Sequence, residues 1–324
     1  MPAFAKEKFR RNDFANEVLN SYGRRNMDSL LRIFPQKRRA FWQKTADNGE
    51  KICEIRLRVD RPVIVETSRG DYFLNNGGEW QEHPYGAHLV TEAEIRELIA
   101  WLCQDSVYAY ADEIRQGFLT VEGGHRIGLC GQAVLENETV IRTLKNIAFI
   151  NIRVAHEIRG AADGILPKLY KKGKFQNTLI VSPPGFGKTT LLRDLIRQIS
   201  DGNTYGAGLR VGVVDERSEL AGSYLGRPQN DLGMRTDVLD GCPKAQGMLL
   251  LLRSMSPQVI AVDELGEETD RLALQKAAAC GCGLLATLHG TDETDAAKRL
   301  GESCLRQIFD RIVILKGRGR MECR

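Results

Sequence analysis

A short segment containing glycine and lysine, Ser182–Thr190, constrains the fold of this chain more than any other feature. It reads Ser-Pro-Pro-Gly-Phe-Gly-Lys-Thr-Thr, follows the apolar run Thr178–Val181, and leads into a helical pattern that begins near Lys188. A strand, a glycine turn and a helix in this order gather backbone N–H groups and the positive end of a helix around one point, which suits phosphate oxygens. The segment therefore predicts a phosphate-binding loop after a buried strand.

The residue types in this loop suit a nucleoside triphosphate. We expect Lys188 to bridge the terminal phosphates and the hydroxyl of Thr189 to bind Mg²⁺. The remaining nucleotide-binding positions are expected to be Pro184, Gly185, Phe186, Gly187 and Thr190. The first position is Ser182 where the strict pattern has glycine, but this position lies further from the phosphates. The predicted cofactors are ATP and Mg²⁺.

A second strand end supplies the groups that hydrolysis needs in addition to phosphate binding. The run Val259-Ile-Ala-Val-Asp-Glu264 is apolar and ends in two carboxylates. We expect Asp263 to hold Mg²⁺, partly through water, and Glu264 to polarise the attacking water. Two carboxylates at the end of a buried strand are costly unless they face a polar crevice, which favours a catalytic role over a solvated strand end.

Two more apolar runs end in polar side chains. The run Arg210–Asp215 is followed by Glu216, and the run Gly283–His289 ends in an imidazole. Ligands of open parallel sheets bind at the carboxyl ends of the strands, so Glu216 is a further candidate catalytic residue and His289 a candidate sensor of the terminal phosphate. The alternative for His289 is an ordinary packed or surface histidine.

The second half of the chain alternates apolar runs with helical patterns, as a parallel sheet covered by helices on both faces does. Strands are expected at residues 178–181, 210–215, 259–263, 283–289 and 310–315, and helices at residues 188–200, 244–255, 267–280 and 293–302. The sequence therefore predicts an α/β nucleotide-binding domain, with a mostly parallel sheet, over residues 175–324.

The first half has a mixed pattern that indicates a smaller α+β domain over residues 1–157. Helical spacing covers residues 12–46 and 91–105, the second capped by Thr91. Alternating patterns predict strands at residues 52–59, 62–66 and 148–154, and a hairpin over residues 117–131 that turns at Gly123-Gly124. Residues 158–174 are expected to form a linker.

Composition narrows the class of protein. Hydrophobic residues make up 42% of the chain and charged residues 27%, which excludes a largely disordered protein. The net charge of +4 and the aromatic content of 7% give little support for nucleic-acid binding, so no nucleic-acid partner is expected. No apolar run approaches the ~20 residues of a membrane span, and the first residues lack the apolar stretch of a signal peptide. The eight cysteines lack the paired spacing of a zinc site. We therefore expect a cytoplasmic protein with reduced cysteines.

These motifs, in this order, resemble those of the ATPases of type II and type IV secretion systems and of pilus motors. In this resemblance Lys188 and Thr189 lie in the Walker A box, Asp215-Glu216 in the acidic Asp box, Asp263-Glu264 in Walker B, and Ala286–Gly290 in the His box. The resemblance implies a RecA-like P-loop ATPase core and a homo-hexamer. It also implies a nucleotide-binding role for Arg253, while Arg126, Arg142 and Arg153 remain alternatives for an arginine that completes the site.

Within that group, four segments resemble the stage III sporulation AA family, and the resemblance extends over nearly the whole chain. The segments are residues 108–117, 123–128, 215–220 and 235–240. This resemblance implies an ATPase that powers or assembles a secretion-like channel between mother cell and forespore. Its partners would be membrane-embedded channel components, and its place would be the cytoplasm or the inner face of the mother-cell membrane around the forespore.

Two other functions remain open at this point. One is a nucleotide-switched module that binds RNA or single-stranded DNA and hydrolyses ATP slowly. The other is a small-molecule kinase, although no lid with its own arginines is evident and the pair Asp263-Glu264 favours water as the nucleophile.

Overall fold

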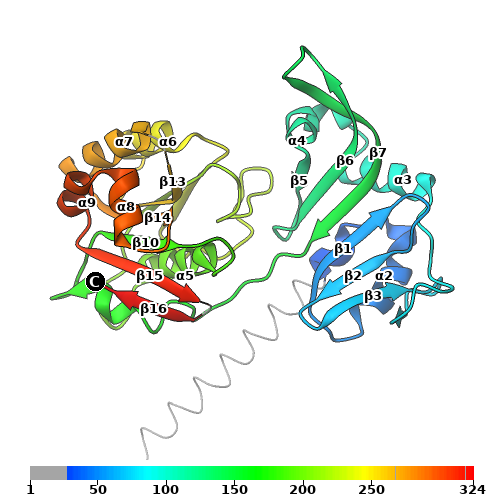
Figure 1. Cartoon of the computed structure of the whole chain (residues 1–324), viewed down its shortest axis with the longest axis horizontal. Helices are drawn as coiled ribbons and strands as arrows, with labels where there is room; N and C mark the ends of the chain where they lie inside the picture. The colour runs from blue at the N-terminus through cyan, green and yellow to red at the C-terminus, as the bar shows by residue number, and fades with distance from the viewer. Residues whose placement is uncertain (1–27, 267, 318) are drawn as a thin grey trace, which may run out of the picture. The chain divides into compact units, whose positions relative to one another are not determined.

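The computed structural model describes residues 28–266, 268–317 and 319–324. The chain divides into two compact units, Met1–His156 and Glu157–Arg324. In Figure 1 the first unit runs from blue to green and the second from green to red. Within the described ranges, none of the helices combines the length and the apolar character needed to cross a bilayer.

The described part of the first unit forms a seven-stranded antiparallel sheet in the order β4-β3-β2-β1-β7-β6-β5. The strands are β1 (Ile52–Arg58), β2 (Ile64–Thr67), β3 (Gly70–Leu74), β4 (Trp80–Gln81), β5 (Phe118–Thr120), β6 (Arg126–Leu135) and β7 (Ile141–Arg153). The helices are α2 (Arg39–Ala46), α3 (Glu92–Leu102) and α4 (Ala111–Gln116), with short 3₁₀ turns η1 (Gln36–Arg38) and η2 (Val107–Tyr110). Alternate strand residues such as Ile55 and Ile152 share one buried core with Trp42 of α2 and Leu98 of α3, so the helices cover one face of the sheet.

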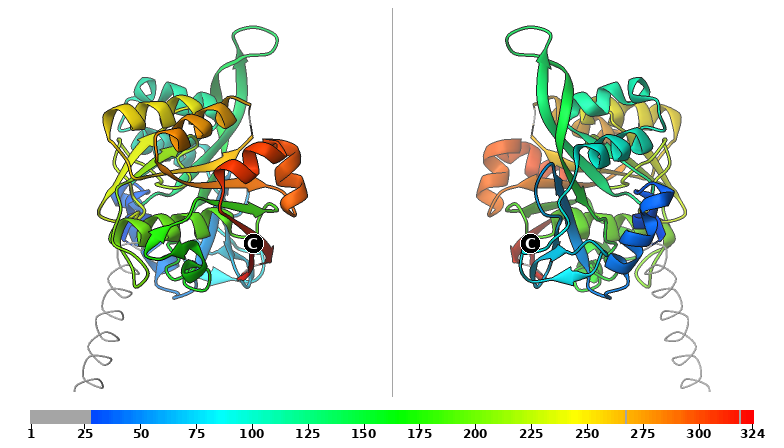
Figure 2. Two further views of the ribbon diagram at one scale, coloured as in Figure 1. Left: turned by 90° about the vertical axis from the view of Figure 1, so that its left-hand side faces the viewer. Right: turned by 90° about the vertical axis from the view of Figure 1, so that its right-hand side faces the viewer.

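Local sequence signals account for much of this unit. Thr91 caps α3 through a capping box with Glu94, and the hairpin β5–β6 turns at Gly123-Gly124, both with positive φ. The predicted strand at residues 148–154 is longer and begins at Ile141, so that β6 and β7 extend past the other strands as a two-stranded ribbon (Figure 2). Helix is confirmed at residues 28–32 and in α2, whereas residues 12–27 of the predicted helical stretch lie outside the described residues.

The described part of the second unit has a seven-stranded sheet in the order β12-β11-β13-β14-β10-β15-β16, and a separate short pair, β8 and β9. The strands are β8 (Tyr170–Lys171), β9 (Lys174–Phe175), β10 (Thr178–Ser182), β11 (Val211–Asp215), β12 (Thr236–Asp240), β13 (Val259–Leu265), β14 (Gly283–His289), β15 (Arg311–Gly317) and β16 (Arg320–Cys323). The helices are α5 (Lys188–Asp201), α6 (Lys244–Ser254), α7 (Glu268–Ala279), α8 (Glu293–Leu300) and α9 (Glu302–Ile308), with the 3₁₀ turn η3 (Leu166–Leu169). The larger sheet is parallel except for β16 at its edge.

Helices cover both faces of this sheet, as the sequence predicts. One buried core contains Leu192 and Ile196 of α5. The other contains Met248 of α6, Leu274 of α7 and Leu305 of α9. Figure 1 shows α5 on one side of the strands and α6 and α7 on the other. The strands at the centre are buried from both sides, which explains their continuous apolar sequence.

Three elements of this unit differ from the sequence-based expectation. The edge strands β12 and β16 carry charged residues and are only partly buried, so their sequences lack the apolar run of a central strand. The helix expected over residues 293–302 ends at Leu300, because Gly301 adopts a positive φ of 82° and a second helix, α9, follows.

Residues 158–174, expected as a linker, belong to the second unit. Ala162, Ile165, Leu166 and Leu169 are buried against α5 and the sheet. Their spacing of three and four residues is a helical signal that the glycine and proline content of the segment obscured.

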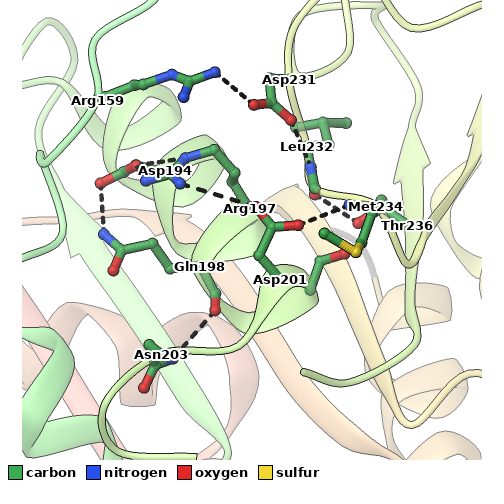
Figure 3. A network of polar contacts seen from close by, with 12 residues as sticks. Arg159, Asp194, Arg197, Gln198, Asp201, Asn203, Asp231, Leu232, Met234 and Thr236 are labelled. Atoms are coloured by element: carbon green, nitrogen blue, oxygen red, sulfur yellow. Dashed lines mark hydrogen bonds and ion pairs between the residues drawn. The ribbon is translucent and has the colours of Figure 1, made fainter. Parts of the chain in front are cut away.

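Polar contacts attach the same segment to α5 and to a neighbouring loop (Figure 3). Asp194 of α5, 3% exposed, accepts a hydrogen bond from the backbone N–H of Ala162 at 2.9 Å. It also pairs with Arg197 at 2.7 Å. Arg159 reaches Asp231 at 2.6 Å. The chain therefore enters the second unit along α5.

Candidate functional site

The predicted phosphate loop joins β10 to α5. All five residues of β10 are buried, and α5 begins at Lys188 directly after Gly187. Gly185 and Gly187 have φ values of 78° and 89°, a region that only glycine enters without strain. A Cβ at either position would meet no heavy atom within 4 Å, so the backbone there borders open space. Both the conformation and the space fit a loop that wraps phosphate oxygens.

The carboxyl ends of four neighbouring strands surround this loop. The strands β11, β13, β14 and β10 are adjacent in the sheet and parallel. Because their chain direction is shared, Glu216 after β11, Asp263 and Glu264 in β13, and His289 at the end of β14 come from one edge of the sheet. This is the edge at which open parallel sheets bind ligands.

A β-bulge directs both carboxylates of β13 toward Lys188. Successive residues of a regular strand point to opposite faces, yet the Nζ of Lys188 lies 3.2 Å from Glu264 Oε1 and 3.8 Å from Asp263 Oδ1. The pairing of β13 with β14 shifts between Val262 and Leu265, and Glu264 has a left-handed φ of 54°. The left-handed conformation costs roughly 1–2 kcal/mol for a residue other than glycine.

Thr287 of β14 holds the bulge in place. Its hydroxyl, 0% exposed, accepts a hydrogen bond from the backbone N–H of Glu264 at 2.8 Å and donates to Asp263 Oδ1. Thr189 donates to the other oxygen of Asp263 at 3.1 Å. The hydroxyl of Thr189 and the carboxylate of Asp263 are hard oxygen ligands on adjacent elements, and this donor set fits Mg²⁺, which takes one or two protein ligands beside phosphate oxygens and water.

The Glu264 carboxylate is the electrostatic centre of the site. Its Oε1 lies 2.8 Å from His289 Nε2 and its Oε2 lies 3.0 Å from Arg217 Nη1, in addition to the contact with Lys188. Burial acts to raise the pKa of Glu264, but the charge and hydrogen bond of Lys188 and the hydrogen bond of His289 outweigh it, so that this pKa is lowered. Glu264 is therefore an anion at neutral pH.

His289 has one ring nitrogen in use and one without a partner. Nε2 contacts Glu264, whereas Nδ1 is buried and has no hydrogen-bond partner among the described residues. The arrangement fits a histidine that donates from Nε2 to the carboxylate. His289 thus lies within the site, where the sequence predicted it.

The loop after β11 is held by a buried carboxylate and a half-buried arginine. Asp215, 2% exposed, accepts hydrogen bonds from the backbone N–H groups of Glu219, Leu220 and Ala221 at 2.8–3.0 Å. Burial raises the pKa of Asp215 despite these bonds. Arg193 of α5 donates to the carbonyls of Glu219 and Leu220 at 2.8 and 2.9 Å. Asp215 therefore fixes the backbone of the loop.

Glu216 lies at the predicted sheet edge, and its catalytic role stays a prediction. Glu216 forms an ion pair with Lys244 at the start of α6, and the loop residue that reaches the Glu264 carboxylate is Arg217. Arg217 had no separate sequence signal, because its contact depends on how the loop folds back over the sheet edge.

Arg253 does not lie near the phosphate loop of its own chain. It occupies the last turn of α6, six residues before the start of β13. Lys244, at the other end of the helix, is the residue that pairs with Glu216 at the carboxyl edge. The two ends of a seven-residue strand are about 20 Å apart, so the implied nucleotide contact of Arg253 is not made within the chain.

The three arginines of the first unit have partners or exposed positions there. Arg126 lies 3.8 Å over the ring of Phe118, Arg153 pairs with Glu54 at 3.2 Å, and Arg142 is exposed on β7. Their part in nucleotide binding stays a prediction.

Comparisons with known proteins agree with these features. The family model "Sporulation stage III, protein AA" matches residues 24–322. The stage III sporulation protein AA of Bacillus subtilis (strain 168) is 38% identical over 274 residues, which cover 84% of this chain and 85% of that protein.

Two solved structures share the fold at low sequence identity. The ATPase DotB of Legionella pneumophila has a TM-score of 0.53 and 16% identity, over 85% of this chain and 74% of that chain. The pilus retraction motor PilT with bound ADP has a TM-score of 0.56 and 15% identity, over 84% of this chain and 76% of that chain. The predicted α/β fold, a RecA-like core preceded by a smaller α+β part, is confirmed. The chain belongs to the sporulation stage III protein AA family.

Proposed function

We propose that this protein is an ATPase that binds Mg²⁺-ATP at the loop Ser182–Thr190 and hydrolyses it with water activated by Glu264. The observation that carries the proposal is the bulge in β13, which turns both Asp263 and Glu264 toward Lys188. A bulge with a left-handed glutamate is costly in a purely structural strand end, and such strain is typical of functional sites.

The contacts of Lys188 suggest how the site receives ATP. Lys188 is 5% exposed and its ammonium group rests on Asp263 and Glu264. Negatively charged phosphates compete with these carboxylates for the ammonium group, and the backbone N–H groups of the loop and the start of α5 add further attraction.

The chemistry then follows from the positions of the remaining groups. Thr189 and Asp263 would hold Mg²⁺, which supplies charge neutralisation for the β- and γ-phosphates when bound. Glu264 orients water in line with the γ-phosphorus and takes up its proton as the new P–O bond forms. The bond from the γ-phosphorus to the bridging oxygen breaks, and its electron pair leaves with ADP. His289, on the same carboxylate oxygen, keeps Glu264 oriented once Lys188 has moved to the phosphates.

Family membership supports a role for this hydrolysis in sporulation. We propose that the protein forms a homo-hexamer, as its resemblance to secretion ATPases implies, and that it powers or assembles a channel between mother cell and forespore. Its partners would be membrane-embedded channel components. The protein would work in the cytoplasm, attached to the inner face of the mother-cell membrane around the forespore.

Two variants test the catalytic part of the proposal. We expect Lys188→Ala to lose ATP binding, and Glu264→Gln to retain ATP binding while turnover falls ~10²–10⁴-fold, the range of a lost general base. Binding is measured with a labelled ATP analogue, and turnover by phosphate release. The matched controls Lys276→Ala and Glu268→Gln, both at exposed positions of α7, should behave like the unaltered chain. Undiminished turnover in Glu264→Gln would remove the assigned base.

The oligomeric part is tested by a size measurement with and without ATP. A hexamer in the presence of ATP supports the ring-forming ATPase. A monomer whose size ignores nucleotide, together with tight RNA binding, would instead favour the nucleotide-switched RNA-binding module.

A further inference from the structure

Arg217 is the residue of the site whose role the proposed function leaves open. Its neighbours in the loop are fixed: Glu216 pairs with Lys244, and Ser218 donates to Asp240 at 2.8 Å. Together with the anchors at Asp215 and Arg193, these contacts hold the loop backbone on both sides of Arg217. The base of the Arg217 side chain is therefore well positioned.

The far end of the same side chain is free to move. The Arg217 side chain is 66% exposed and its guanidinium group contacts Glu264 Oε2 at 3.0 Å. An exposed ion pair of this kind contributes only about 0–1 kcal/mol to stability. A long arginine on a fixed loop, with one weak contact at its tip, can leave that contact for a more strongly charged partner at little cost.

The nearest such partner would be the terminal phosphate. Lys188 and Arg217 occupy the two oxygens of one carboxylate, Oε1 and Oε2 of Glu264. The P-loop lysine binds the β- and γ-phosphates, so a guanidinium group on the opposite oxygen of the same carboxylate lies beside the γ-phosphate position. Arginine suits this task, since its planar fork binds phosphate through two parallel hydrogen bonds.

We propose that Arg217 is the charge-compensating arginine of the hydrolytic site and acts within its own chain. This inference rests on the proposed ATPase function. In the structure Arg217 neutralises Glu264. When ATP draws Lys188 away from the carboxylates, the guanidinium group turns to the γ-phosphate and stabilises the charge that spreads over its oxygens as the bond to ADP breaks. Glu264 is released from one cation and is free to accept a proton from water.

The first test separates catalysis from binding. We expect Arg217→Ala to bind ATP and ADP within about threefold of the unaltered chain, while kcat falls ~10³-fold or more, the range found for charge-compensating arginines. The affinity for ADP with aluminium fluoride, which mimics the transferred phosphoryl group, should fall in parallel with kcat. Arg217→Lys keeps the charge without the fork and should show an intermediate kcat. The control is Arg227→Ala, an exposed arginine of the same loop region, with unchanged kcat.

The second test asks whether the arginine acts within the chain or on a neighbour. Arg217→Ala and Glu264→Gln chains are mixed and allowed to assemble before turnover is measured. An arginine that acts in its own chain gives no recovery, because no chain holds both groups. Recovery of turnover would overturn the proposal, since it requires Arg217 of one chain to serve Glu264 of another.

The outcomes distinguish this inference from the proposed function. If the unaltered chain hydrolyses ATP and Lys188→Ala does not, but Arg217→Ala keeps its kcat within threefold, the ATPase stands and the role of Arg217 is refuted. If the unaltered chain releases no phosphate above the Lys188→Ala variant, the proposed function itself fails. Far-UV circular dichroism and ADP binding of Arg217→Ala show that any loss of turnover arises in a folded protein.

Discussion

Thr287 is a small buried residue whose hydroxyl holds the bulge in β13, and Thr287→Val isolates that contribution. The substitution keeps nearly the same shape and replaces the hydroxyl with a methyl group. The N–H of Glu264 then loses its acceptor at 2.8 Å, and Asp263 loses one of its two hydroxyl donors while keeping Thr189. An unsatisfied buried N–H costs about 1–3 kcal/mol and a hydrogen bond to a carboxylate contributes about 1.5–3 kcal/mol, part of which solvent restores. We expect the second unit to be destabilised by about 2–4 kcal/mol.

The assay can assign this loss to one unit. Trp42, Trp80 and Trp101 all lie in the first unit, so tryptophan fluorescence reports that unit, whereas far-UV circular dichroism reports both. For a unit of this size, 2–4 kcal/mol corresponds to a fall in melting temperature of about 5–15 °C. The dichroism transition should shift by this amount while the fluorescence transition stays in place. Thr287→Ser, which keeps the hydroxyl and loses one methyl group, should cost only about 1 kcal/mol. Equal shifts for the Val and Ser variants would refute the reasoning.

Two further predictions concern buried titratable groups. Burial, with a smaller contribution from His156, lowers the pKa of His125 from 6.5 to about 4. The unfolded chain therefore takes up a proton at a higher pH than the folded one. The stability of the folded first unit is full above pH 6.5 and falls as the pH decreases toward 4. The first unit should therefore lose about 2 kcal/mol between pH 7 and pH 5, measured by urea unfolding with tryptophan fluorescence, and an unchanged slope in His125→Gln would exclude this histidine as the cause. Asp194→Ala leaves the Ala162 N–H and the Arg197 charge without their buried partner. The free energy of unfolding of the second unit, followed by circular dichroism, should therefore fall by about 3–5 kcal/mol. A fall of less than about 1 kcal/mol would show that water replaces the carboxylate.

The parts of the fold that follow local rules could be predicted from the sequence. The predicted phosphate loop lies between a buried strand and a helix start and contains two glycines, and all these signals lie within thirteen residues, Thr178–Thr190. The carboxylates Asp263 and Glu264 could also be predicted, because they directly follow an unbroken apolar run in the sequence. The capping box at Thr91 and the Gly123-Gly124 turn are equally local.

The remainder depends on pairing between distant segments. The hydroxyl of Thr287 accepts the N–H of Glu264 because the register between β13 and β14 shifts at a bulge. The sequence periodicity of neither strand predicts such a shift. The contact of Arg217 with Glu264 depends on the path of a loop. The contact of Glu216 with Lys244 depends on the start of a helix 28 residues further along the chain. Arg253 lies near Walker B in sequence but at the other edge of the sheet in space, so its part in a site shared between chains stays a prediction.

The attachment of the entering segment to α5 has a mechanical consequence. Tension on the chain between the two units is passed through Arg159 and Ala162 to Asp231 and Asp194. Asp194 lies on the same 14-residue helix that begins with Lys188. Part of a pull on the connecting segment would therefore reach the helix that begins at Lys188, the residue proposed to bind the phosphates, and part would reach the loop that carries Asp231.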